Sequence, residues 1–241
     1  MTRRLDPEKI IQFKEKLRAS RISPVFLHTP YLLNLGSPKK DIYEKSVESL
    51  KTELLRANEL GIGFVVTHLG SHLGYGKVNG LRRVVKALGN SLSTVEKDVV
   101  LLLENNAGTK NSLGSSFEDL QYITSRIRDS SQIGICFDTC HAFVAGYDLV
   151  SENAVNHTLH RLDETVGLST LKLVHLNDSK GGLGSRLDRH EHIGFGRIGE
   201  IGFRNILRSE LKTRPLILET PIDSRRNDIA NLQKVRELAT T

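Results

Sequence analysis

Six short apolar runs, each ending in a histidine or an acidic residue, constrain the fold of this chain more than any other feature. Most are rich in Val, Ile, Leu or Phe, as strands buried in a parallel sheet are. The runs are PVFLH ending at His28, GFVVTH at His68, VVLLLE at Glu104, IGICFD at Asp138, LKLVH at His175 and PLILE at Glu219. Helix-like segments with apolar stripes lie between them, so strand and helix alternate along the sequence.

Alternating strands and helices imply a parallel sheet, either closed into a barrel or open and doubly wound. In a barrel the carboxyl ends of the strands meet at one face, where the active site lies. An open sheet would scatter these residues along an edge, and no GxGxxG follows any run to suggest a nucleotide crevice. We therefore predict a TIM-type α/β barrel. Without a linker or a low-complexity tract, residues 1–241 are predicted to form a single domain.

Several helix starts and faces can be predicted in detail. Asp6-Pro7 and Ser37-Pro38 each suit the cap and first position of a helix. The apolar residues Ile229, Leu232, Val235 and Leu238 mark the last helix-like segment.

Composition limits the class of protein. The formal charge of +6 and the pI of about 9.3 favour an anionic partner. The opening MTRRLDPEKI has no following apolar run, and no window resembles a membrane span, so we expect a cytoplasmic protein that does not contact membranes. The two cysteines, Cys136 and Cys140, form no CxxC motif, which fits a reducing compartment and excludes a Cys-rich zinc module. We expect both to be packing residues.

The strand ends and the loops after them carry candidate metal ligands. A single histidine at a strand end is most often structural, but six strand ends with the same chemistry are hard to explain by chance. Mixed imidazole and carboxylate ligands suit zinc, manganese or iron better than magnesium or calcium. Nine candidates are too many for one ion, and a cluster of two or three ions suits phosphoryl displacement. The nine are His28, His68, Glu104, Asp138, His141, His175, Asp188, His190 and Glu219.

Five segments resemble a known family. THLGSH, LLENNAG, DTCHAFVAGYD, HLNDSKGGLGSRLDRHEHIGFGRIG and LILET are similar to motifs of the endonuclease IV family of apurinic/apyrimidinic endonucleases, and HTPYLLNLGSP fits the same pattern. The resemblance runs in order from about residue 6 to the C-terminus. It implies a TIM barrel with three zinc ions, with manganese or iron as substitutes. It also implies a role in base excision repair, with cleavage of DNA on the 5′ side of an abasic site to leave a 3′-hydroxyl.

Carried over residue by residue, the resemblance implies three ligand sets. The sets are His28, His68 and Glu104; then Glu104, Asp138, His175 and Glu219; and then His141, Asp188 and His190. Glu104 would bridge two ions, and Glu104 and Glu219 are the expected catalytic carboxylates. The implied reaction is attack of a metal-held hydroxide on the phosphate, without a covalent enzyme intermediate.

The resemblance also implies how double-stranded DNA with abasic sites is recognised. The lesion must leave the duplex to reach a recessed cluster. Tyr31 and Leu32 would wedge into the base stack, and Arg186 and Arg189 would contact phosphates. We expect a monomer, unless an incomplete barrel pairs with another chain.

Two alternatives remain open. Sugar isomerases and epimerases with one or two divalent metals place similar residues at the strand ends of the same kind of barrel. The DRH motif and the basic charge argue against this class. A weakly active, truncated DNA-binding remnant is the second alternative, although the intact ligand set argues against decay at the metals.

The sequence further predicts that the first two barrel strands are missing. His28 and Glu219 are 191 residues apart over five gaps, so eight strand–helix units would need roughly 300 residues against the 241 present. The first predicted element is a helix, whereas a barrel of this type begins with a strand. The resemblance agrees, because the family's first two strands and a lesion-probing arginine have no counterpart here. About six of eight strands are therefore expected.

Overall fold

The computed structural model describes residues 5–95 and 98–240. Met1–Arg4, part of the opening from which no signal peptide is expected, lie outside the described residues. The helices and strands are α1 (Pro7–Ser20), β1 (Phe26–His28), α2 (Lys40–Leu60), β2 (Phe64–Thr67), α3 (Lys77–Leu92), β3 (Val100–Glu104), α4 (Phe117–Thr124), β4 (Ile133–Asp138), α5 (Thr139–Ala145), α6 (Glu152–Thr165), β5 (Leu171–His175), β6 (Asp178–Ser179), β7 (His190–Glu191), α7 (Gly199–Arg208), β8 (Leu216–Ile217) and α8 (Asp228–Thr240).

The chain divides into two compact units. Unit 1 comprises residues 1–103 and 122–134, and unit 2 comprises residues 104–121 and 135–241. This partition does not test the prediction of a single barrel domain over residues 1–241, which stays a prediction.

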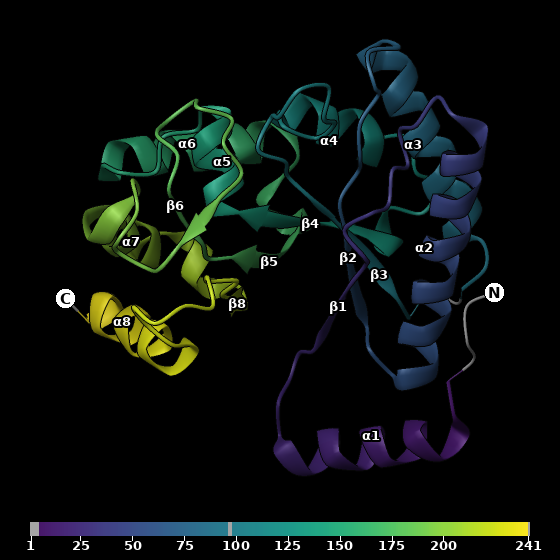
Figure 1. The fold of residues 1–241 in the computed structure, drawn as a ribbon, viewed down its shortest axis with the longest axis horizontal. Coiled ribbons are helices and arrows are strands. Elements are labelled where there is room, and N and C mark those ends of the chain that lie inside the picture. Colours follow the sequence, from purple (N-terminus) through teal and green to yellow (C-terminus); the bar gives the residue numbers. More distant parts are fainter. Residues whose placement is uncertain (1–4, 96–97, 241) are drawn as a thin grey trace. The chain divides into compact units, whose positions relative to one another are not determined.

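Unit 1 contains the parallel strands β1, β2 and β3. Phe64 of β2 is paired with Phe26 of β1 on one side and with Val100 of β3 on the other. Helices α2 and α3 pack against each other, and Leu50 and Leu54 of α2 are fully buried. Helix α1 lies across one end of α2 and buries none of its residues (Figure 1).

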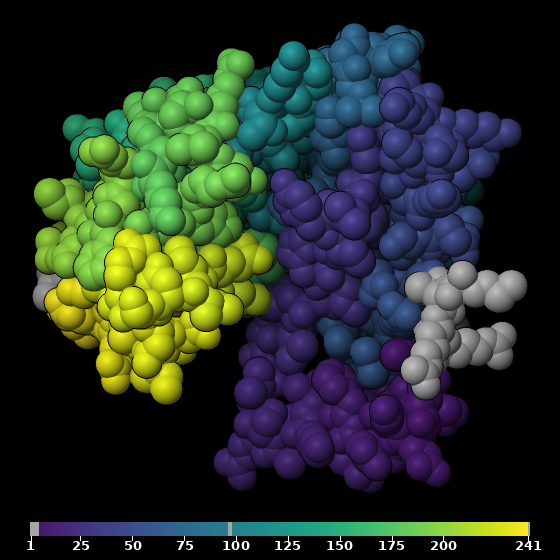
Figure 2. All heavy atoms as spheres, in the orientation of Figure 1, coloured from purple at the N-terminus to yellow at the C-terminus, as the bar shows by residue number. Residues whose placement is uncertain are grey.

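Unit 2 contains the parallel strands β4, β5 and β8. Asp138 at the end of β4 is paired with His175 at the end of β5, and His175 is paired in turn with Ile217 of β8. A short antiparallel pair, β6 and β7, follows the carboxyl end of β5. Helices α7 and α8 pack together, and their yellow-green and yellow surfaces adjoin in the space-filling view (Figure 2). The register therefore aligns the carboxyl ends of the unit 2 strands.

The predicted runs match the observed strands closely. Each of the six runs forms a parallel strand in the described residues, so the prediction of about six strands in an alternating α/β arrangement is confirmed. The predicted start of α1 is also confirmed, because Asp6 accepts a hydrogen bond from the backbone of Glu8 at 3.0 Å.

One local prediction is wrong. Helix α2 begins at Lys40 rather than at Pro38, because the Ser37 hydroxyl accepts from the backbone of Lys39 within the preceding turn. On α8, Ile229 is 67% exposed, whereas Asn231 is fully buried. Asn231 Nδ2 donates to the hydroxyl of Thr220 at 3.1 Å. The spacing of apolar residues cannot predict burial of a polar side chain through such a hydrogen bond.

None of the described helices is long and apolar enough to cross a membrane.

Candidate metal centre

Four predicted ligands of unit 2 lie at or just beyond strand ends. Glu104, Asp138 and His175 are the last residues of β3, β4 and β5, and Glu219 follows β8 by two residues. One ligand atom from each lies within 4.8 Å of those of the other three. His175 Nδ1 is 3.0 Å from Glu104 Oε1 and 3.2 Å from Glu219 Oε2. Ligands about 2.1 Å from a tetrahedral ion are roughly 3.4 Å apart, so these spacings suit a shared cation.

The local sequence explains how this group forms. The side chain of Asp138 accepts from the backbone of His141 at 2.7 Å and so caps helix α5. One carboxylate therefore ends a strand and begins a helix. It keeps Oδ2 for other partners and places His141 in the first turn of α5.

A second group consists of His141, Asp188 and His190, whose ligand atoms also lie within 4.8 Å of one another. His141 Nε2 is 3.2 Å from Asp188 Oδ1, and His190 Nε2 is 3.9 Å from the same oxygen. Among the hydrogen bonds of the described residues, the buried Nε2 of His190 has no partner.

The opposite ring nitrogens support a metal at this second group. His141 Nδ1 lies 2.9 Å from the carbonyl of Asn105, and His190 Nδ1 lies 3.0 Å from the carbonyl of Glu219. A carbonyl only accepts, so each Nδ1 must carry the proton. A ring protonated at Nδ1 alone would present its Nε2 lone pair to the group, as metal-binding histidines do. The residues present therefore fit a divalent cation.

Electrostatics lead to the same conclusion. Burial lowers the pKa of His141, but Asp138 and the neighbouring carboxylates outweigh it and raise that pKa to about 10. Burial likewise opposes the charged form of His175, yet its hydrogen bonds and close polar neighbours raise its pKa. Buried carboxylates this close together require positive charge, which a metal ion can supply in place of these protons.

Two asparagines hold the ligands and were not singled out from the sequence. Asn105 accepts from the backbone N–H of Asp138 at 2.7 Å and donates to its carbonyl at 3.0 Å. Asn177 donates to Asp138 Oδ2 at 2.6 Å and to Glu219 Oε2 at 3.2 Å, and it accepts from the backbone of Glu219 at 2.8 Å. In the sequence, only their position one or two residues after a predicted ligand, in LLENN and VHLN, could have indicated this role.

The remaining two predicted ligands belong to unit 1. His28 ends β1 and His68 follows β2, and their ring centroids are 5.2 Å apart. His28 Nδ1 lies 2.7 Å from the carbonyl of Thr29. Glu104 belongs to unit 2, so its assignment to a common ion with the two histidines stays a prediction.

The predicted DNA-contacting residues are accessible. Tyr31 is 76% exposed and Leu32 is 89% exposed, both in the loop after β1. Arg186 and Arg189 are exposed in the loop between β6 and β7. Exposure permits contact with DNA, and the roles of these four residues stay predictions.

Both cysteines are buried thiols close to the ligand groups. Cys136 Sγ lies within 4.8 Å of ligand atoms of Glu104 and His175. Burial raises the pKa of both Cys136 and Cys140 to about 12, which favours the neutral thiol over a metal-binding thiolate. Their predicted packing role stays a prediction.

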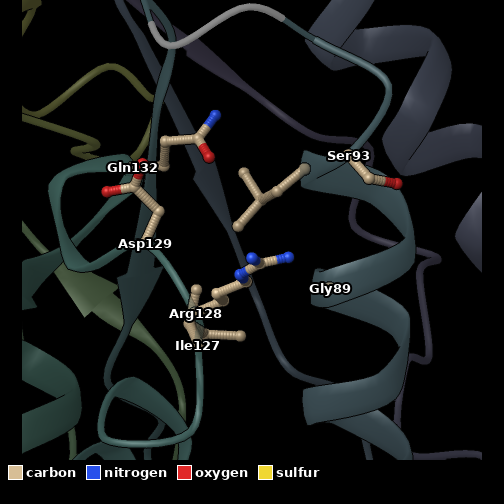
Figure 3. Close-up of a pocket in the computed structure, with 7 residues that line it drawn as sticks. Gly89, Ser93, Ile127, Arg128, Asp129 and Gln132 are labelled. Atoms are coloured by element: carbon tan, nitrogen blue, oxygen red, sulfur yellow. The ribbon is translucent and has the colours of Figure 1, made fainter.

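A cavity of about 440 Å³ in unit 1 lies apart from these residues. It is lined by Gly89 of α3, by Ser93 directly after that helix, and by the segment that carries Arg128 and Asp129 (Figure 3). These two segments precede β3 and β4 in the chain, whereas Glu104 and Asp138 are the last residues of those strands. No predicted site residue lines this cavity.

Comparison with known proteins identifies the family. The family model described as a xylose isomerase-like TIM barrel matches residues 2–239. A probable endonuclease 4 of Methanoculleus marisnigri is 54% identical over 98% of this chain and 84% of that protein. The chain belongs to the endonuclease IV family of xylose isomerase-like TIM barrels. The predicted TIM-type fold, the predicted family and the expectation of an enzyme of this type are thus confirmed.

Two further comparisons describe the range of this fold. Endonuclease IV from Thermus thermophilus is 38% identical, with a TM-score of 0.82 over 100% of this chain and 83% of that one. A D-tagatose 3-epimerase-like protein is 22% identical with a TM-score of 0.75, which shows a shared fold alone.

Proposed function

We propose that this chain is a DNA repair endonuclease that hydrolyses the phosphodiester 5′ to an abasic site and leaves a 3′-hydroxyl. Curated relatives named probable endonuclease 4 support a nuclease of this family. The site of cleavage and the metal cluster are our own inference. We further propose that the chain acts on double-stranded DNA as a monomer.

The observation that carries the proposal is the convergence of seven predicted ligands within unit 2. They form two groups of closely spaced nitrogen and oxygen atoms, and the buried Nε2 of His190 has no hydrogen-bond partner among the described residues. Hydrogen bonds with Asn177 and with two backbone carbonyls orient the side chains of Asp138, His141 and His190. A sugar-converting enzyme with one or two metals would not require the second group of His141, Asp188 and His190.

Three zinc ions would be held by the nine predicted ligands. His28, His68 and Glu104 would hold the first, and Glu104, Asp138, His175 and Glu219 would hold the second. His141, Asp188 and His190 would hold the third. When bound, the ions would supply positive charge next to the phosphate. They would also lower the pKa of a bound water molecule, so that hydroxide is available at neutral pH. Manganese or iron could take their place.

The protein's own side chains would bind the substrate and orient the cluster. Glu104 and Glu219 hold the ring of one buried ligand, His175, since both lie within 3.2 Å of its Nδ1. Asn177 fixes the carboxylates of Asp138 and Glu219. The buried position of Glu104 and Asp138 means that the target phosphate must be drawn towards the cluster, which favours a sugar that has left the base stack.

The deciding experiment combines metal analysis with cleavage of a labelled abasic duplex. We expect about three zinc ions per chain, incision on the 5′ side of the lesion and a product that a polymerase can extend. Epimerisation of ketohexoses without DNA incision would establish the sugar-converting alternative. Binding to the abasic duplex without turnover, despite a full complement of metal, would establish the DNA-binding remnant.

A further inference from the structure

The two residues proposed to wedge into DNA are presented by a tight turn in unit 1. The backbone N–H of Leu33 donates to the carbonyl of Pro30 at 3.3 Å, with Tyr31 and Leu32 between them. Their side chains are 76% and 89% exposed, so they have little packing of their own. Exposed loop side chains are mobile unless their backbone is anchored.

Asn34, directly after this turn, supplies an anchor on two sides. Its backbone N–H donates to the hydroxyl of Ser46 on α2 at 2.9 Å. Its side-chain Oδ1 accepts from the backbone N–H of Ser71, in the loop after β2, at 2.9 Å. The turn is thereby tied to a helix and to the loop that follows His68.

Gly70 makes this second connection possible. Its φ of +81° is a backbone conformation that favours glycine. A Cβ at this position would overlap Oδ1 of Asn34 and lie 2.6 Å from the Asn34 Cα. The two loops are therefore in direct backbone contact, closed by the hydrogen bond between Asn34 and Ser71.

The contact places the wedge turn beside a predicted metal ligand. The ring of Tyr31 meets the ring of His68 edge-on, with centroids 5.7 Å apart. A change in the contact between the loops would move Tyr31 relative to His68 without removing either side chain.

We propose that Asn34 is a positioning residue for lesion recognition. With Gly70 and Ser71 it forms a latch that locks the wedge turn to the loop after His68. This inference rests on the proposed function, in which Tyr31 and Leu32 enter abasic DNA. A pre-ordered turn binds without the entropic cost of ordering two side chains in the complex.

The first test compares two glycine substitutions at similar backbone angles. Gly70→Ala forces the latch open, whereas Gly74→Ala, at a φ of +87° with nothing within 4 Å of the new Cβ, introduces similar backbone strain away from the latch. On a fully paired abasic duplex we expect kcat/KM to fall by at least ~10-fold for Gly70→Ala, and by no more than about twofold for Gly74→Ala.

Substitutions at Asn34 separate positioning from folding. Asn34→Ala should lose activity as Gly70→Ala does, whereas Asn34→Asp keeps an acceptor for Ser71 and should approach the parent. Both Asn34→Ala and Gly70→Ala should recover to within about threefold of the parent when the abasic site lies in a mismatched bubble, because that lesion is already unstacked. Metal content, measured on each variant, should stay close to that of the parent.

A double-mutant cycle gives the decisive outcome. If Asn34 acts through Tyr31, the double variant Tyr31→Ala/Asn34→Ala should be no worse than Tyr31→Ala alone. Additive losses, or an equal loss on paired and bubble substrates, would overturn the latch. A parent protein that leaves abasic DNA intact would instead reject the proposed function, and this inference with it.

Discussion

Asn177→Ala should weaken metal binding in unit 2 although the substitution removes no ligand. The variant loses the donor to Asp138 Oδ2 at 2.6 Å, the donor to Glu219 Oε2 at 3.2 Å and the acceptor for the backbone N–H of Glu219. Groups that orient metal ligands typically contribute 10- to 100-fold in metal affinity or activity. Because Asn177 orients two ligands, we expect a loss of roughly 100-fold, or about 2.7 kcal/mol.

Competition with a chromophoric zinc chelator measures this loss directly, and single-turnover cleavage of an abasic duplex measures its effect on the reaction. Asn205→Ala is the matched control, because Asn205 also donates a hydrogen bond within unit 2, but to the backbone carbonyl of Val150, at 2.8 Å, and not to a predicted ligand. The control should bind zinc as the parent does. Parental zinc affinity and cleavage rate in Asn177→Ala would refute the role assigned to this amide.

Three further predictions concern the cluster, the DNA surface and the fold. Glu104→Gln should abolish cleavage, because this 1%-exposed carboxylate is proposed to bridge two ions. Circular dichroism should show a largely intact fold. Near-normal turnover would contradict the bridging role. Tyr31→Ala should reduce the preference for abasic over undamaged duplex. Arg189→Ala should mainly reduce the slope of log Kd against log salt concentration, by roughly 0.9 for each phosphate that is no longer neutralised. If both variants had the same slope and the same preference as the parent, this division of the DNA surface would be refuted. Asp178→Ala should lower stability by about 4 kcal/mol and the thermal midpoint by roughly 10 °C, because the carboxylate accepts from three backbone N–H groups of residues 194–198 at 2.9–3.1 Å. A scanning-calorimetry shift of less than ~3 °C would show that solvent satisfies those donors.

Much of the fold was predictable because strand burial is recorded in the chain itself. The runs that end at His28, Glu104, Asp138 and His175 end the observed strands at the same residues. Parallel strands buried on both faces require continuous apolar side chains, so a polar residue marks the point where burial stops or function begins. The start of α1 was predictable for a different reason, because the cap at Asp6 depends on residues only two apart.

Packing between distant segments was not predictable from the sequence. Ile229 fits an apolar stripe, yet it is exposed, while Asn231 is buried against His192. Periodicity reports which face could be buried and not what lies opposite it. Asn105 and Asn177 were overlooked for the same reason, since their partners are 33 to 42 residues away.

The sequence by itself determined the alternation of strand and helix, the chemical nature of the strand ends and, through its motifs, the family. These properties follow from local burial patterns and from residue types in order. Only the tertiary structure decided that Asp138 and His175 are paired in register, that Asn177 joins two carboxylates and that Asn34 meets Gly70 across two loops. Such contacts depend on strand register and on the path of the backbone through space, and a shift of one residue in either would separate the same side chains.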